Sequence, residues 1–475
     1  MATLLRPDIC VIGAGSGGLS VAAGAVQLGA KTVLIESGKM GGDCLNYGCV
    51  PSKSLLAAAH RAVAHRAARD FGVSYEPPRI DWDRTRAHIR KVIAEIAPHD
   101  SIERFEALGV KVIKASAKFI DADTVEAGDY RIAAKRFVLA TGSSPAVPPV
   151  PGLDQIPYLT NETIFEVEGQ IRHLVVIGGG PIGAELAQAH VRLGARVTVL
   201  EMARLLPHDD PDLVETVRSS LIRDGVMLFE GAKVIDVARN GAEIQVNFAG
   251  ASGMSSAVSG THLLVATGRR PNLAALDLAA AGIDATAAGV TVDARLRSSN
   301  KRVFAVGDCA GGPAFTHVAG YHAGIVIRNA LFRLPAKVDY RALPWVTFTD
   351  PELAVVGLNE TEARRKWPDC VVTTANFADN DRARTGGETA GRIKVISRPN
   401  GRILGVALVG AQSGELVAPW CLAIGRGLKL SAIAGAVFPY PTLSELSKSV
   451  AGRFYTPKLF NPWMRRLVGF LLRLP

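Results

Sequence analysis

The chain has 475 residues, and 48% of them are hydrophobic, which supplies enough apolar side chains for roughly three globular domains. Its 54 lysines and arginines against 44 aspartates and glutamates give a net charge of +10, which favours anionic partners such as dinucleotides or acidic lipids. No basic low-complexity tract or nucleic-acid-binding motif occurs, so we expect no nucleic acid partner. Six cysteines are too few for the disulfide framework of a secreted protein.

The N-terminal lead before the first apolar run lacks the pattern of a signal or transit peptide. No uninterrupted apolar run reaches the roughly 20 residues that a membrane-spanning helix requires. We therefore expect a cytoplasmic protein.

A dinucleotide-binding pattern opens the chain. Residues 8–12 predict a buried parallel strand, residues 19–28 an alanine-rich helix, and residues 31–36 a second strand that ends in Glu36. The turn before the helix has the GxGxxG spacing of Gly13, Gly15 and Gly18. These glycines let the backbone approach a pyrophosphate at the helix N-terminus, and Glu36 can accept a hydrogen bond from a ribose hydroxyl. We predict a bound dinucleotide, with an ordinary glycine-rich turn as the alternative.

Two cysteines, Cys44 and Cys49, follow five positions apart. Four intervening residues can close a small ring, and Gly48 gives the backbone freedom beside the second sulfur. Both could instead be small buried hydrophobic residues. The adjacent fingerprint favours a redox-active disulfide. Cys10 and Cys309 lie in apolar, strand-like segments, so we expect them to be inert packing residues.

Residues 53–121 have a helical pattern, clearest at 55–68 and 89–108. Strand-like segments follow and end at Thr141 and Gly142. The proline-rich residues 145–151 then indicate a domain boundary.

The fingerprint recurs as Gly178, Gly180 and Gly183, and the strand at 196–201 ends in Glu201. A second complete fingerprint predicts a second bound dinucleotide. A carboxylate at this strand end accepts from a free 2′-hydroxyl and repels a 2′-phosphate. We therefore expect NADH to be favoured over NADPH, although the nearby Arg204 works against this preference.

Residues 263–271, with Gly268, repeat the earlier Ala-Thr-Gly segment and indicate that the chain returns to the first domain. A short buried strand then delivers Asp308 to a glycine turn. Asp308 suits a cofactor hydroxyl or phosphate region, and a purely turn-forming aspartate is the alternative. From residue 337 onward no further fingerprint occurs, which predicts a third domain of another kind.

With these motifs the chain resembles the pyridine nucleotide-disulfide oxidoreductases, the flavoprotein family that includes dihydrolipoamide dehydrogenase, glutathione reductase and mercuric reductase. The resemblance rests on both fingerprints and on residues 41–53, 266–269, 306–308, 349–352, 356–358 and 441–445. It implies an α/β fold with two doubly wound dinucleotide-binding domains, for FAD and NAD(P), and a C-terminal α+β dimerisation domain that forms a homodimer. The expected boundaries are 1–149 with 272–336 for FAD, 150–271 for NAD(P), and 337–475 for dimerisation.

The resemblance also implies roles for individual residues. Cys49 would be the thiol nearest the flavin, and Cys44 would attack the substrate. Lys53 would pair with Glu185 near the flavin, and Asp308 would hold the ribityl chain of FAD. The remaining cofactor-binding residues would be the glycines and terminal acids of both fingerprints with Lys53, Thr141, Gly142 and Gly268. Tyr440 and Glu445 would complete the catalytic set, and no resident metal site is implied.

One position departs from the family pattern. Thiol-handling members end their active site with His-Pro-Thr-x-x-Glu, supplied by the partner subunit, whereas here Tyr440 replaces the histidine. A phenol with a pKa near 10 cannot replace an imidazole as a neutral-pH base, although it can donate a hydrogen bond or approach a soft metal. This tyrosine and residues 380–383 resemble mercuric reductase. The C-terminal cysteine pair usual in that enzyme is missing, since the last cysteine is Cys421.

We therefore predict an NAD(P)H-dependent flavoprotein that passes electrons through FAD and the Cys44–Cys49 disulfide to a small oxidant, most like mercuric reductase. The alternatives are a dihydrolipoyl dehydrogenase, a membrane-associated NADH:quinone reductase and a non-enzymatic flavin redox sensor.

The tail is basic, because no acidic residue follows Glu445. A helix over 463–474 would have one apolar side, opposite Arg465, Arg466 and Arg473. That side would contain Trp463, Met464, Leu467, Val468, Phe470, Leu471 and Leu474. This pattern fits packing on the dimer, and it also fits peripheral contact with the inner face of a membrane.

Overall fold

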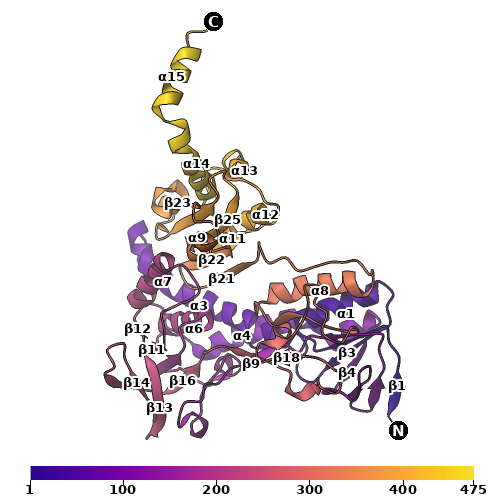
Figure 1. Ribbon diagram of the computed structural model, residues 1–475. Helices are drawn as coiled ribbons and strands as arrows, with labels where there is room; N and C mark the ends of the chain where they lie inside the picture. Colours follow the sequence, from indigo (N-terminus) through magenta and orange to yellow (C-terminus); the bar gives the residue numbers. More distant parts are fainter. Residues whose placement is uncertain (1) are drawn as a thin grey trace. The chain divides into compact units, whose positions relative to one another are not determined.

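Figure 1 shows the computed structural model, which describes residues 2–475. The chain divides into two compact units. The first unit comprises Met1–Ala62, Pro78–Met202 and Phe229–Val338. The second comprises Val63–Pro77, Ala203–Leu228 and Asp339–Pro475.

A five-stranded parallel sheet in the first unit contains the first fingerprint. Its order is β20-β8-β2-β3-β4, and each neighbouring pair is parallel. The strands are β2 (Ile9–Ile12), β3 (Thr32–Glu36), β4 (Lys111–Lys114), β8 (Arg136–Leu139) and β20 (Val303–Ala305). All four residues of β2 are buried, as expected for a parallel strand covered on both faces.

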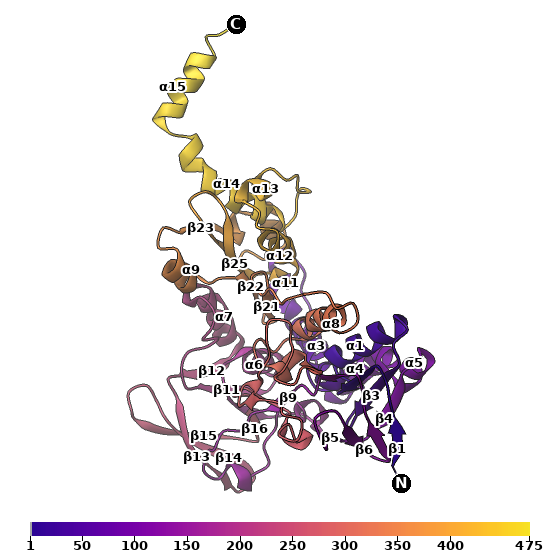
Figure 2. The same ribbon diagram turned by 45° about the vertical axis from the view of Figure 1, so that its right-hand side comes forward.

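Helices α1 (Ser16–Gln27) and α8 (Thr316–Ala330) lie side by side in both views of the molecule (Figures 1 and 2). Small residues permit this close approach, since a Cβ added at Gly17 would lie 3.3 Å from the Cβ of Ala319. Helix α1 connects β2 to β3, which confirms the predicted strand–turn–helix–strand order.

The second fingerprint repeats this arrangement around a second parallel sheet. Strand β10 (His173–Ile177) lies between β11 (Arg196–Glu201) and β16 (His262–Val265), parallel to both. Helix α6 (Pro181–Arg192) connects β10 to β11. Strand β12 (Val226–Glu230) is next to β11 in this four-stranded sheet. An antiparallel sheet is formed by β13 (Lys233–Asn240), β14 (Glu243–Ala249) and β15 (Ser255–Gly260).

The two Ala-Thr-Gly segments meet in the structure. Strand β9 (Ser143–Pro145) pairs antiparallel with β17 (Arg269–Pro271), with Arg269 opposite Pro145. The smaller elements of this unit are β1 (Thr3–Leu5), β5 (Ala117–Phe119), β6 (Val125–Ala127), β7 (Tyr130–Ile132), β18 (Ala285–Thr286) and β19 (Gly289–Val290).

The helical prediction for residues 53–121 is partly wrong. Helix α3 (Cys49–Ala68) covers the predicted 55–68, but irregular chain follows before α4 (Trp82–Ile96). The predicted helix 89–108 is interrupted, because Pro98 falls in a short 3-10 turn and Ser101 caps a new helix, α5 (Ile102–Ala107). Gly109, at φ +96°, ends that helix, and the chain then enters strands β4 and β5.

The second unit is built on an antiparallel sheet of order β21-β22-β25-β24-β23. Trp420 is fully buried in its hydrophobic core and donates to Ser447. The strands are β21 (Pro344–Thr347), β22 (Glu352–Gly357), β23 (Val371–Asn376), β24 (Arg392–Ser397) and β25 (Ile403–Gly410). The helices are α7 (Pro211–Asp224), α9 (Glu360–Lys366), α10 (Asp381–Thr385), α11 (Ser413–Leu416), α12 (Ala418–Gly425), α13 (Leu430–Ala434), α14 (Glu445–Leu459) and α15 (Pro462–Leu471).

A buried lysine joins three elements of the second unit. The Lys394 ammonium on β24 lies 2.5 Å from Asp212 of α7, 3.3 Å from Asp210 and 3.3 Å from Glu360 of α9. Burial acts to lower the pKa of Lys394, but the hydrogen bond to Asp212 and the surrounding carboxylates outweigh it, so the pKa is raised. Lys394 is therefore charged and tightly held.

The predicted tail helix is present as α15, which begins at Pro462 and ends at Leu471, so the predicted helical residues Arg473 and Leu474 lie beyond it. Among residues 2–475, no helix is both long and apolar enough to cross a membrane. The α/β class predicted from the motifs, with two parallel dinucleotide-type sheets and a separate C-terminal domain, is confirmed.

Candidate active site

The two cysteines at positions 44 and 49 lie directly beside the first fingerprint. Cys44 is in the short helix α2 (Gly42–Asn46), and Cys49 begins α3. Gly42 has a φ of +60°, and a Cβ there would lie 2.7 Å from the Cα of Gly15. Only glycine permits this approach, which holds the cysteine segment against the GxGxxG turn. Cys44 is half-buried, Cys49 is exposed, and both are free thiols here.

The two thiols have opposite tendencies to ionise. A hydrogen bond from Cys44 is the largest influence on Cys49 and lowers its pKa, and partial burial opposes this. Thr316 and the positive charge of Lys53 lower it further, to about 6. The same hydrogen bond raises the pKa of Cys44 above its usual value. At neutral pH Cys49 is therefore the thiolate and Cys44 the proton donor.

Thr316 is a contact that the sequence motifs did not indicate. Its Oγ1 lies 3.4 Å from the sulfur of Cys49, at the first residue of α8. Only the packing of α8 on α1 brings residue 316 to residue 49, so no local pattern marks it. Its one sequence signal is a hydroxyl residue at a helix start shortly after Asp308.

Lys53 and Glu185 form the ion pair that the resemblance implies. The Lys53 Nζ lies 2.6 Å from the Glu185 Oε2, across 132 positions of sequence. Lys53 lies one turn after Cys49 on α3, and Glu185 lies in the first turns of α6. The Glu185 side chain is only 7% exposed, so its charge needs this partner.

The first fingerprint has room for a dinucleotide. A Cβ at Gly18 would lie 1.8 Å from the Gly13 carbonyl oxygen, so this glycine is required for packing of the helix on the strand. A Cβ at Gly15 would meet nothing closer than 3.9 Å, which leaves open space at the N-terminus of α1. The Glu36 carboxylate accepts from the backbone amides of Ala14 and Gly38, at 2.5 Å each, and so lies at this turn. FAD fits this site.

The second fingerprint matches the first in detail. A Cβ at Gly183 would lie 2.0 Å from the Gly178 carbonyl oxygen, while Gly180 faces open space. Glu201 accepts from the Gly179 amide at 2.5 Å, as Glu36 does from Ala14. A nicotinamide dinucleotide fits this second turn.

Asp308 belongs to a polar network. Ser143 donates to its carboxylate at 2.5 Å, and Arg269 in turn donates to the Ser143 hydroxyl at 2.7 Å. Arg269 also lies 3.2 Å from Asp43, the neighbour of Cys44. Of these residues only Asp308 was given a role from the sequence. The network therefore joins the predicted ribityl contact to the cysteine segment through Arg269.

The Ala-Thr-Gly segments supply further polar and open positions. The Thr141 hydroxyl is buried and has no hydrogen-bond partner within residues 2–475. Gly142 and Gly268 have φ values of +65° and +128°, and a Cβ at either would meet nothing within 4 Å. A buried hydroxyl without a hydrogen-bond partner, next to open space, is a position where a bound cofactor could supply the missing partner.

Tyr440 and Glu445 lie in the second unit. The Tyr440 hydroxyl donates to Asp381 at 3.1 Å, and its side chain is 71% exposed. The hydrogen bond to the Asp381 carboxylate raises the pKa of Tyr440 above 10, so the phenol stays protonated at neutral pH. Asn380 caps α10 and donates to the Thr442 carbonyl, which ties this helix to the tyrosine segment. Glu445 begins α14.

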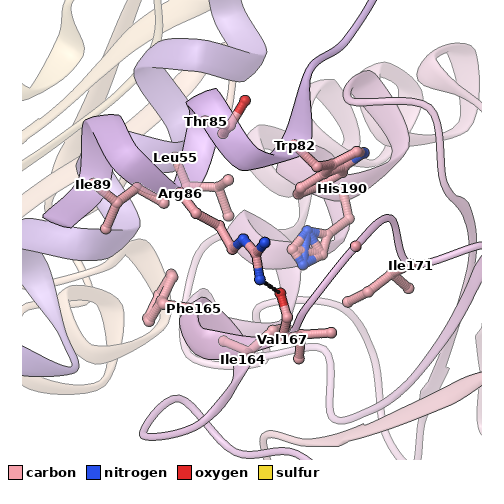
Figure 3. A pocket seen from close by; sticks show the side chains of 11 residues that line it. Leu55, Trp82, Thr85, Arg86, Ile89, Ile164, Phe165, Val167, Ile171 and His190 are labelled. Atoms are coloured by element: carbon pink, nitrogen blue, oxygen red, sulfur yellow. Dashed lines mark hydrogen bonds between the residues drawn. The ribbon is translucent and has the colours of Figure 1, made fainter.

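A small pocket in the first unit lies between α3, α4 and α6 (Figure 3). Its volume of about 20 Å³ has room for one water. Trp82 meets His190 edge-on at 5.6 Å, and neither His190 nitrogen nor the indole nitrogen has a partner in the described part of the chain. Burial lowers the pKa of His190 to about 4, so this histidine is neutral and serves packing. Cys10 and Cys309 are fully buried, as predicted for packing residues.

No group of three or more histidine, cysteine or acidic side chains able to hold a metal ion occurs within residues 2–475.

Comparison with known proteins extends over nearly the whole chain. The family described as pyridine nucleotide-disulphide oxidoreductase matches residues 7–323, and its dimerisation domain matches residues 343–451. A mercuric reductase of Lysinibacillus sphaericus is 35% identical over 94% of this chain and 82% of its own length. A dihydrolipoyl dehydrogenase of Geobacillus stearothermophilus is 33% identical over 94% of this chain and 96% of its own length.

A solved structure has the same fold. The Cu(II) complex of the HOCl-induced flavoprotein disulfide reductase RclA from Escherichia coli aligns with a TM-score of 0.84 and 27% identity, covering 94% of this chain and 99% of that one. These matches show an FAD-dependent enzyme class that uses a pyridine nucleotide. The chain belongs to the pyridine nucleotide-disulphide oxidoreductase family.

Proposed function

We propose that this oxidoreductase uses NADH to reduce a soft, thiophilic metal ion of the Hg(II) class, with Cys44 and Cys49 as the groups that bind it. The observation that carries the proposal is that the pKa values of the two thiols are shifted in opposite directions. The pKa of Cys49 is lowered to about 6, and that of Cys44 is raised. A disulfide substrate needs a base to remove the Cys44 proton, whereas a thiophilic metal displaces that proton on binding.

Tyr440 supports the same choice of substrate. Its pKa is raised by Asp381, so the phenol cannot accept a proton at neutral pH. It can donate a hydrogen bond or contact a soft ion. A relative of similar sequence is a mercuric reductase, and the structural relative was solved with Cu(II).

The electron balance is simple. NADH gives up a hydride, which carries two electrons, and the metal ion gains two electrons and leaves as the metal, so that one proton is released. The first fingerprint would hold FAD, whose flavin would supply two-electron transfer between nicotinamide and sulfur. Cys44 and Cys49 accept two electrons as a disulfide, open to thiol and thiolate, and hold the metal through both sulfurs as the thiol proton leaves. The metal then takes the two electrons from the sulfurs, and the disulfide re-forms as the metal is released. Lys53, fixed by Glu185, keeps positive charge beside the Cys49 thiolate.

We propose NADH rather than NADPH as the reductant, because Glu201 would meet a 2′-phosphate with like charge. The Arg204 guanidinium, the opposing feature, donates to the backbone carbonyls of Pro207 and Asp209 at 2.7 and 2.8 Å. These bonds hold Nη2 within its own segment, while Nη1 is buried with no hydrogen-bond partner among residues 2–475. A kcat/KM ratio that favours NADPH would reject the preference.

We also propose that the protein acts as a homodimer, supported by the match of residues 343–451 to the family's dimerisation domain. In that arrangement Tyr440 and Glu445 of one subunit would complete the site of the other.

An acceptor panel tests the proposed substrate. NADH oxidation by the FAD-loaded protein is measured with mercuric ion, cupric ion, lipoamide, glutathione disulfide and a short-chain quinone. We expect the highest kcat/KM with mercuric ion, a loss of roughly a hundredfold or more in Cys44→Ala and Cys49→Ala with flavin retained, and no loss in Cys421→Ala. Preference for lipoamide would favour a dihydrolipoyl dehydrogenase, and quinone turnover in the cysteine variants would show that electrons leave from the flavin.

We also propose that the enzyme contacts a membrane surface. The observation behind this part of the proposal is helix α15, none of whose residues is buried.

A further inference from the structure

Helix α15 and the residues around it form an unburied apolar surface in the second unit. None of its ten residues is buried, and both views show it extending away from the C-terminal sheet (Figures 1 and 2). Trp463 is 67% exposed and Phe470 60%. The preceding helix α14, in contrast, buries Val450 and Phe454 in the core of its domain.

The charges around this surface are all of one sign. At 100° per residue, the apolar side chains of α15 occupy one broad side, and Arg465 and Arg466 lie opposite with Gly469 between them. Arg473 lies two positions beyond the end of the helix at Leu471. No acidic residue occurs after Glu445, and none of these three arginines has an acidic partner among the residues described. Helix α15 therefore has one apolar side and one positively charged side.

The dimerisation domain does not account for this helix. The match to that domain ends at residue 451, inside α14, and α15 begins eleven positions later at Pro462. The last side-chain tie to the domain is Lys458, which donates to the Pro399 carbonyl at 3.0 Å. Asn461 then caps α15 by accepting from the Met464 amide. The start of α15 is therefore fixed by its own capping residue, and the helix begins after the last side-chain hydrogen bond from this segment to the domain.

We propose that α15 lies in the surface of an anionic lipid bilayer, with Trp463 and Phe470 at the acyl boundary and Arg465, Arg466 and Arg473 at the headgroups. An amphipathic helix with a basic polar side and exposed aromatic residues binds at such an interface without spanning it. Each arginine near an anionic surface strengthens binding about fivefold, so three arginines contribute roughly a hundredfold. This inference rests on the membrane contact proposed above and specifies anionic lipid as the ligand. The attachment would bring the reductase to a membrane and is independent of the identity of its oxidant.

Vesicle binding by the full-length, FAD-loaded protein tests the proposal. Sedimentation is measured with vesicles of phosphatidylcholine mixed with phosphatidylglycerol and with vesicles of phosphatidylcholine alone. The variant Arg465→Gln/Arg466→Gln/Arg473→Gln removes the tail charges. Its matched control, Arg79→Gln/Arg239→Gln/Arg365→Gln, removes the same charge from exposed positions elsewhere. Trp463→Ser with Phe470→Ser removes the aromatic contacts.

The proposal predicts salt-sensitive binding to the mixed vesicles, a loss of roughly a hundredfold in the tail charge variant, and unchanged binding in the control. The aromatic variant should also lose binding, and wild-type emission should shift on binding because Trp463 is highly exposed. Equal binding to both vesicle types, or equal loss in the control, would overturn it. Loss of dimers in the aromatic variant without lipid binding by the wild type would assign the helix to a second copy instead. Turnover with a soluble acceptor is measured in each variant, so failure of membrane binding is distinguishable from failure of the reductase.

Discussion

Replacing Thr316 by valine should raise the pKa of Cys49. The hydroxyl oxygen lies 3.4 Å from the sulfur and is one of the groups that lower this pKa to about 6. A hydrogen bond to a charged group contributes about 1.5 kcal/mol at the weaker end of its range, which suits a long contact to sulfur. At 1.36 kcal/mol per pKa unit, its loss corresponds to about one unit. Valine has nearly the same shape as threonine, so the packing of α8 is retained.

The consequence appears in the pH profile. With a pKa of about 6, Cys49 is a thiolate at neutral pH and protonates as the pH falls through 6. With the pKa moved to about 7, roughly half of the thiolate is lost at neutral pH. Activity in the variant should therefore begin to fall at a higher pH than in the wild type.

The assay is the ultraviolet thiolate absorbance of the reduced, FAD-loaded protein as a function of pH, with Cys49→Ser subtracted to remove the flavin contribution. Thr316→Ser is the matched control, since it retains the hydroxyl and should retain the low pKa. An unchanged midpoint in Thr316→Val, or the same shift in Thr316→Ser, would refute the assignment of the hydroxyl as a thiolate partner.

Three further predictions concern the cofactor turn, the second unit and the tyrosine. Gly15→Ala should fold but retain less flavin, whereas Gly18→Ala should not fold, because its Cβ would lie 1.8 Å from a carbonyl oxygen. Flavin content measures the first effect, and circular dichroism measures the second. Lys394→Met should destabilise the protein by about 3 kcal/mol, because three carboxylates lose their shared cation. The loss should appear as a lower midpoint of urea unfolding, and a midpoint equal to that of the wild type would show that the cluster is not stabilising. Tyr440→His should raise the kcat/KM for lipoamide relative to mercuric ion by supplying a neutral-pH base, and an unchanged ratio would show that this position does not contact the dithiol.

The elements around the dinucleotide sites could be predicted because their signals are local. The buried run of β2, the glycines that follow it and the terminal Glu36 all lie within about thirty residues, and each restricts the backbone directly. The same holds for β10 and Glu201. The pairing of Lys53 with Glu185, across 132 positions, was implied only by the resemblance, since nothing local joins them.

The errors have physical reasons as well. Residues 111–119 were assigned to a helical region, but Val112 and Ile113 are buried in a sheet whose other strands lie far away in sequence. Thr316 was not singled out, and Arg269 was noted only as part of the motif at 266–269, because their contacts to Cys49 and Asp43 depend on how α8 and β17 pack. Residues 380–383 were noted only for their resemblance to mercuric reductase, and the contact between Asp381 and Tyr440 depends on how the two segments pack.

We propose that Cys44 and Cys49 form a redox disulfide that exchanges electrons with the bound flavin. Anaerobic reductive titration of the FAD-loaded protein with dithionite tests it most directly, because it counts electron pairs per subunit. We predict two pairs for the wild type, one for the flavin and one for the disulfide, and a single pair for Cys44→Ala and for Cys49→Ala. A single pair in the wild type would contradict the claim.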